Sequence, residues 1–161
     1  FRQQAESSNQ IKTEKNQLLE NDLLRLCFVE DEKIRQYLFE FVNKDWFTST
    51  QSQDIFEKVY IHLHSDNTPQ AGVVMDELKE DKDRRLLADL LYDLDNLNAT
   101  MENAQECVLR MEKKWISNQI DALREELKNS ESSGNDPLPI MKKIENFQLQ
   151  KKNLSYHVLN E

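Results

Sequence analysis

The sequence predicts an all-α protein, with a bundle of about five helices followed by a long helix and a C-terminal antiparallel helical hairpin. Only two glycines and three prolines occur in 161 residues, and a sheet protein of this length would need more of both for its turns. Apolar residues recur every three or four positions along most of the chain, which is the period of one helix face. The C-terminal part adds heptad patterns on both sides of one strong turn signal.

The N-terminal stretch is polar and has almost no apolar period. We expect residues 1–13 to form a frayed linker, because a segment without an apolar face gains little by packing. The chain begins with Phe1 rather than methionine, and we expect it to be a fragment of a longer protein. The helical period starts at Glu14. Residues 14–98 are expected to form the bundle, and residues 99–161 the long helix and hairpin.

The first three bundle helices each show a recognisable start or face. The first carries apolar residues spaced by threes and fours: Leu18, Leu19, Leu23, Leu26 and Cys27. The second is expected from about Asp31 to Val42, with acidic residues in its first turn, where they favour the helix dipole. The third is expected to end near His64 and has a choice of caps at its start: Thr48, Ser49 and Thr50.

The fourth and fifth helices complete the bundle. Thr68 is the expected cap of the fourth, with Pro69 in its first position, and Gly72 predicts that this helix is short. The fifth carries a leucine stripe: Leu86, Leu87, Leu90, Leu91 and Leu94. A break follows, with Asn98 or Thr100 as the next cap.

The long helix has no breaker from about Thr100 to Asn129. At 1.5 Å per residue it spans on the order of 45 Å, which is longer than a small bundle is wide, so part of it must project. Its apolar positions form a heptad seam: Leu109, Ile116, Ile120, Leu123 and Leu127. Trp115 lies beside this seam, and we interpret it as a wedge between bundle and hairpin, with a partner anchor as the alternative.

A second heptad helix follows the turn signal at Gly134, Pro137 and Pro139. Its seam is Ile140, Ile144, Phe147, Lys151, Leu154 and Val158. A short connection between two such helices predicts an antiparallel hairpin. Lys151 occupies a seam position, so we expect its side chain either to extend out of the seam or to mark a contact.

The charge of the chain argues against direct nucleic-acid binding. The formal net charge is −9, and residues 1–100 carry 12 Lys and Arg against 20 Asp and Glu, whereas residues 101–161 carry 9 against 10. A bundle at −8 repels phosphate backbones. No run of about 18 apolar residues and no signal peptide is present, so we expect a soluble, cytoplasmic chain with no membrane contact.

Neither a catalytic site nor a metal site is predicted. His62 and His64 would point to different sides of a helix, and His157 is remote in sequence, so the three histidines do not form a metal site. Cys27 and Cys107 lie on apolar helical stretches and are expected to be reduced, packed thiols. Two glycines cannot make a Gly-rich phosphate loop. We therefore expect no catalytic, cofactor-binding or metal-binding residue in this chain, and protein recognition remains.

Several strings resemble the C-terminal, helicase-interacting domain of bacterial DnaG-type DNA primases. The resemblance covers about residues 14–160. It is carried by the order of elements and by "ENDLLRLCFVEDEKIRQYLFEFV", "DWFTSTQSQDIFEKVYIHL", "RRLLADLL" and "CVLRMEKKWISNQIDALREEL". The second string is also similar to the N-terminal domain of DnaB-type helicases, whereas the long helix, short turn and terminal helix are more similar to the primase arrangement.

The resemblance implies a function in DNA replication at the primosome. In that family a small helical bundle and a hairpin dock on the N-terminal domains of the replicative helicase, recruit primase to the fork and modulate the helicase. The polymerase chemistry, with its zinc and magnesium, belongs to upstream domains, so this bacterial, cytoplasmic chain is expected to be non-catalytic. As a monomer or a hairpin-swapped dimer, it would hold the helicase through its last helix, at Gln148, Leu149, Lys152, Tyr156 and Leu159.

Two alternatives remain open at the level of sequence. The first is an N-terminal assembly domain of a DnaB-type helicase, which would build a ring with copies of itself. The second is a hairpin coiled-coil interaction module unrelated to replication. Self-association distinguishes the first alternative from a recruiting module, and concentration-dependent helicity without helicase binding distinguishes the second.

Overall fold

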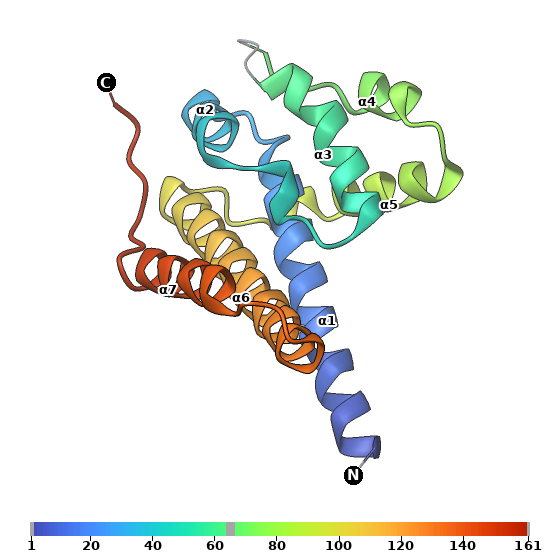
Figure 1. Ribbon diagram of the computed structural model, residues 1–161. Helices are drawn as coiled ribbons and strands as arrows, with labels where there is room; N and C mark the ends of the chain where they lie inside the picture. Colours follow the sequence, from blue (N-terminus) through green and yellow to red (C-terminus); the bar gives the residue numbers. More distant parts are fainter. Residues whose placement is uncertain (1, 64–66, 161) are drawn as a thin grey trace.

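The computed structural model describes the backbone of residues 2–63 and 67–160, with side chains from Glu14 onward. The described part contains seven α-helices and no strand (Figure 1), and the all-α prediction is confirmed. The helices are α1 (Arg2–Leu26), α2 (Glu32–Phe41), α3 (Thr50–Leu63), α4 (Ala71–Glu77), α5 (Asp81–Tyr92), α6 (Met101–Ser133) and α7 (Leu138–Lys152). Two 3₁₀ turns, η1 (Lys44–Trp46) and η2 (Leu94–Asn96), lie between them.

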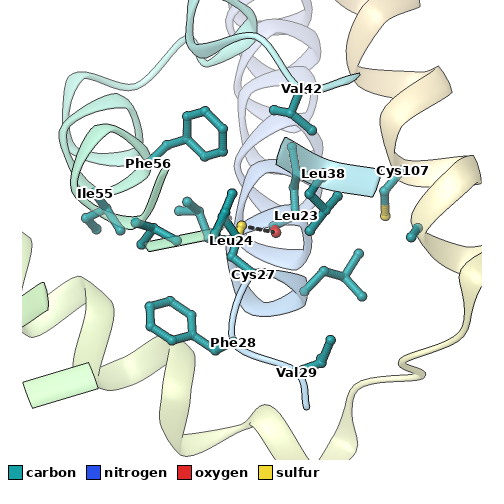
Figure 2. Packing of buried hydrophobic residues seen from close by; sticks show 14 of the residues in the cluster. Leu23, Leu24, Cys27, Phe28, Val29, Leu38, Val42, Ile55, Phe56 and Cys107 are labelled. Atoms are coloured by element: carbon teal, nitrogen blue, oxygen red, sulfur yellow. Dashed lines mark hydrogen bonds between the residues drawn. The ribbon is translucent and has the colours of Figure 1, made fainter. Parts of the chain in front are cut away.

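The C-terminal half of α1 lies at the centre of the hydrophobic core. Leu23 and Leu24 of α1 and Cys27, which directly follows it, are fully buried. Figure 2 shows these three residues surrounded by side chains of α2, α3 and α6, which include Phe56 of α3 and Leu38 of α2. Burial of this apolar face is the main stabilising term for a bundle of this kind.

Side-chain caps define where three helices begin. The Asp31 carboxylate accepts hydrogen bonds from the backbone N–H groups of Lys33 at 3.0 Å and Ile34 at 3.4 Å, and so caps α2. The Thr100 hydroxyl caps α6 by accepting from the N–H of Asn103 at 3.1 Å. The Ser49 hydroxyl accepts from the N–H of Ser52 at the start of α3, at 3.4 Å. Ser49 and Thr100 are among the caps predicted for α3 and α6, whereas for α2 the sequence predicted acidic charge in the first turn and no particular cap.

A buried carboxylate ties α1 to the start of α3. Glu20 has no exposed surface, and it accepts hydrogen bonds from the Thr48 N–H, from the Thr48 hydroxyl at 3.2 Å and from the Ser49 N–H at 3.5 Å. These N–H groups lie at the positive end of the α3 dipole, where a carboxylate is stabilising. Sequence periodicity gave no sign of this contact between distant segments.

Two predicted boundaries are wrong. Helix α1 begins at Arg2 rather than near Glu14. Once the packed part of the helix has formed, each further residue adds a hydrogen bond without a new nucleation cost. No proline or glycine in residues 2–13 ends the helix. Helix α4 begins at Ala71, with Gln70 in the cap position, rather than at Pro69. Pro69 is buried instead. The predicted end of the third helix at His64 lies outside the described residues, and α3 is described to Leu63.

The long helix α6 belongs to both parts of the molecule. Its N-terminal half is buried in the bundle at Ala104, Cys107, Val108 and Met111. Its C-terminal half runs alongside α7, which packs against it in the opposite direction (Figure 1). With 33 residues, α6 spans about 50 Å. The predicted long helix and antiparallel hairpin are confirmed.

The last helix is shorter than the heptad pattern predicts. Helix α7 ends at Lys152, so the expected seam positions Leu154 and Val158 lie outside it, and Val158 is 70% exposed. Ser, Tyr, His and Val follow one another at positions 155–158, and all four are weaker helix formers than Leu or Lys. Their contacts with the bundle, described below, stabilise a non-helical course instead.

Candidate protein-docking site on the hairpin

The hairpin turn is fixed by glycine and by local hydrogen bonds. Gly134 has φ +75°, a left-handed conformation in which other residues are strained. The N–H of Asn135 reaches back to the carbonyl of Ser130 at 3.1 Å, and the Ser130 hydroxyl donates to the carbonyl of Asn135 at 3.2 Å. The Asp136 carboxylate accepts from the N–H of Leu138 at 3.1 Å and starts α7. The turn therefore returns α7 along α6 in a defined direction.

Trp115 connects the bundle to the hairpin. Its indole packs against the bundle core and meets the Phe147 ring of α7 edge to face, with ring centroids 5.8 Å apart. Edge-to-face pairs are favourable because the positive ring edge meets the negative ring face. The predicted position of Trp115, between bundle and hairpin, is confirmed.

The five residues predicted to face a partner lie in two places. Gln148, Leu149 and Lys152 are exposed on α7. Tyr156 and Leu159 lie beyond the end of that helix, where Tyr156 is about half exposed and Leu159 packs against the bundle core. The first three thus share one helix surface, and the last two belong to a C-terminal segment that runs back to the bundle.

This C-terminal segment, residues 153–160, is held by polar contacts. The Tyr37 hydroxyl of α2 donates to the carbonyl of His157 at 2.9 Å. The His157 Nε2 atom lies 2.7 Å from the Glu112 carboxylate of α6, and its ring stacks on Phe41 with centroids 4.8 Å apart. The Tyr156 hydroxyl donates to Glu106 at 2.7 Å. The segment therefore joins α2 to α6.

Ionisation in this region follows from those contacts. The hydrogen bond from Tyr156 holds the pKa of Glu106 below its usual range, and the same bond raises the pKa of Tyr156. Burial, with a smaller effect of Glu112, raises the pKa of Tyr37 to about 12. At neutral pH the two tyrosines are therefore hydrogen-bond donors and Glu106 is an acceptor.

A groove separates α6 from α7 on one side of the hairpin. Its cavity has a volume of about 510 Å³. The α6 wall consists of Lys113, Ser117, Ile120, Asp121 and Arg124, and the α7 wall of Gln148, Lys151 and Lys152. Two of the predicted partner-facing residues, Gln148 and Lys152, are thus part of this groove. Lys151, which the heptad pattern placed in the seam, lines it as well.

The groove is basic although the chain as a whole is acidic. Of its four cationic side chains, Arg124 pairs with Asp121 at 3.7 Å. Within the described part of the chain, Lys113, Lys151 and Lys152 form no ion pair. The α6 residues of the groove are spaced by threes and fours, a pattern that sequence inspection can detect but that does not by itself show which helix lies opposite.

The remaining reactive side chains are engaged in packing. Cys27 and Cys107 are buried and unpaired. Burial raises the pKa of the Cys27 thiol and that of Cys107 to about 11, so both are protonated at neutral pH and poor nucleophiles. The packed thiols predicted from sequence are confirmed. His62 lies 3.2 Å from the Glu77 carboxylate, and His64 lies outside the described residues.

The described residues contain no group of three or more His, Cys, Asp or Glu side chains placed to hold a metal ion. Within the same ranges, none of the helices combines the length and the apolar character needed to cross a bilayer.

Comparison of the chain with protein-family models, with curated proteins and with solved structures gave no match.

Proposed function

We propose that this chain is a non-catalytic recruiting module that binds the N-terminal domain of a DnaB-type replicative helicase. In this proposal it is the C-terminal part of a bacterial, cytoplasmic DNA primase. It holds the primase at the replication fork for primer synthesis and modulates the helicase. The polymerase chemistry and its zinc and magnesium belong to other domains of the parent protein.

The surface of α7 is the observation that carries the proposal. Helix α7 has no buried side chain. Three of its large apolar residues are between 44% and 59% exposed: Leu138, Met141 and Leu149. A helix that contacts its own protein along one side and leaves apolar groups on the other is typical of a docking element. The fixed turn and the Trp115 contact support this function because they hold α7 in one orientation before a partner arrives.

The order of elements supports the identity of the partner. A five-helix bundle, a long connecting helix and a terminal hairpin follow one another in the order that the primase resemblance implies. We propose a replicative helicase as the partner because several sequence strings of this chain resemble the helicase-interacting domain of DnaG-type primases.

Size-exclusion chromatography with light scattering tests the proposal against the two alternatives. The chain alone is expected to elute as a monomer or a hairpin-swapped dimer, and to co-elute with a hexameric DnaB-type helicase. A ring formed by the chain itself would favour a helicase assembly domain. A chain that neither forms a ring nor joins the helicase would favour an unrelated hairpin module.

A further inference from the structure

We infer that the groove between α6 and α7 binds a carboxylate-rich segment of the partner protein. This inference rests on the proposed function and adds the chemistry of recognition to it. The chain has a formal net charge of −9, yet four cations and only one carboxylate line this groove. Like charges held close together repel one another, and an acidic partner segment would relieve that repulsion.

Three lysines of the groove, Lys113, Lys151 and Lys152, lack the ion-pair partners that two neighbouring cations of α6 have. On α6, Arg110 pairs with Glu106 at 2.9 Å and Lys128 with Glu125 at 4.0 Å, both within one helical turn. The positions three and four residues from Lys113, Lys151 and Lys152 hold no acidic residue. The three groove lysines are therefore not neutralised within their own helices, as Arg110 and Lys128 are.

The groove also has the shape and the hydrogen-bonding groups to hold carboxylates. The cavity of about 510 Å³ is within the usual range for a binding cleft. Ser117 and Gln148, on opposite walls, can donate hydrogen bonds to carboxylate oxygens. Ile120 is nearly buried and adds an apolar contact. A segment with acidic side chains and some apolar surface matches this combination.

An acidic protein segment fits the groove better than a nucleic acid does. Nucleic-acid binding needs a run of cations along the backbone, and single strands also use exposed aromatic rings for stacking. The groove has no aromatic lining residue, and Trp115 beside it is engaged with Phe147.

Charge reversal on α7 tests the inference with a matched control. Lys151→Glu with Lys152→Glu changes the groove, whereas Lys79→Glu with Lys82→Glu makes the same charge change on two exposed residues of the bundle, outside both hairpin helices. Affinity for the isolated helicase N-terminal domain is measured by fluorescence anisotropy at low and moderate salt. We expect the groove variant to lose about tenfold or more, the control to change by less than about threefold, and wild-type binding to weaken with salt. Lys113→Glu, on the opposite wall, is a second test if the double variant does not fold.

Four other outcomes would overturn the inference in distinguishable ways. Equal losses in both double variants would show long-range attraction without a site, and no loss in either would show that the groove is not used; both results leave the proposed function intact. No binding by the wild-type chain at any salt concentration would overturn the proposed function and the inference together. Binding of labelled single-stranded DNA or RNA that only the groove variant loses would assign the groove to nucleic acid instead.

Discussion

The indole of Trp115 meets the ring of Phe147 at an interplanar angle of 80°, with 5.8 Å between the ring centroids. Trp115 also packs against the bundle core, so one side chain contacts both parts of the molecule. The direction of α7 is therefore set by a packed aromatic pair as well as by the turn at Gly134.

Removing the Phe147 ring should loosen α7 from α6. We expect Phe147→Ala to lower the free energy of unfolding by about 2 kcal/mol, because a half-buried ring and its aromatic contact are lost. Urea denaturation gives the change in stability, and Trp115 fluorescence reports the local loss of contact. Leu149→Ala, an exposed neighbour, should change stability by less than about 0.5 kcal/mol. Equal effects of the two substitutions would contradict a connecting role for the pair.

The Glu20 carboxylate should contribute to the attachment of α3. Glu20→Ala removes the acceptor for Thr48 and Ser49, and we expect a loss of about 2 kcal/mol, as for hydrogen bonds to a charged group. The exposed Glu14 on the same helix is the control, and Glu14→Ala should have little effect. Thermal melting followed by circular dichroism measures both. A stable Glu20→Ala variant would show that the N–H groups find other acceptors without cost.

Lys114 is expected to reduce stability at neutral pH. Its Nζ atom is buried without a hydrogen-bond partner in the described part of the chain, and burial lowers its pKa. We expect Lys114→Met to raise the free energy of unfolding by about 1 kcal/mol. Because the folded pKa is lowered, the wild-type chain is destabilised at every pH below that pKa, and the penalty disappears as the pH rises from the folded to the unfolded pKa. The advantage of methionine should therefore shrink near pH 10, and a constant advantage in pH-dependent melting would exclude this origin.

The bond from Tyr156 to Glu106 should make the C-terminal segment sensitive to acid. Because this bond lowers the folded pKa of Glu106, its contribution is complete above about pH 4.3, the ordinary glutamate value, and is lost as the pH falls through the lower folded pKa. In Tyr156→Phe the pKa of Glu106 should rise. An NMR titration of the carboxyl group measures it in both proteins. An unchanged pKa would mean that the hydroxyl does not donate to Glu106 in solution.

Local patterns predicted much of the fold because they report interactions within one turn or one helix. Thr100 was one of two expected caps, Asp31 was the expected start of the second helix, and Gly134 was identified as the turn between two heptad helices. The course of the chain after Lys152 was not predicted, because contacts of His157 with α2 and α6 involve residues far away in sequence. No periodicity reports such contacts.

The candidate site was predictable only on one wall. Gln148 and Lys152 were selected on α7, and Lys151 was noted as a cation in an apolar seam. Lys113 and Arg124 were not selected, because a charged residue on a long solvated helix looks ordinary until the opposing helix is placed. Leu159 was selected as partner-facing, and the structure places it against the bundle core, so its substitution tests stability as well as binding.

Hydrogen exchange of the chain, with and without the isolated helicase N-terminal domain, tests whether α7 and the adjoining part of α6 form the docking surface. With the helicase domain bound, we expect slower exchange in residues 138–152 and 113–124, because an interface protects the backbone of the elements that it covers. Exchange in α4 and α5 should be unchanged. Protection confined to α4 and α5, or no protection anywhere at saturating helicase, would contradict it.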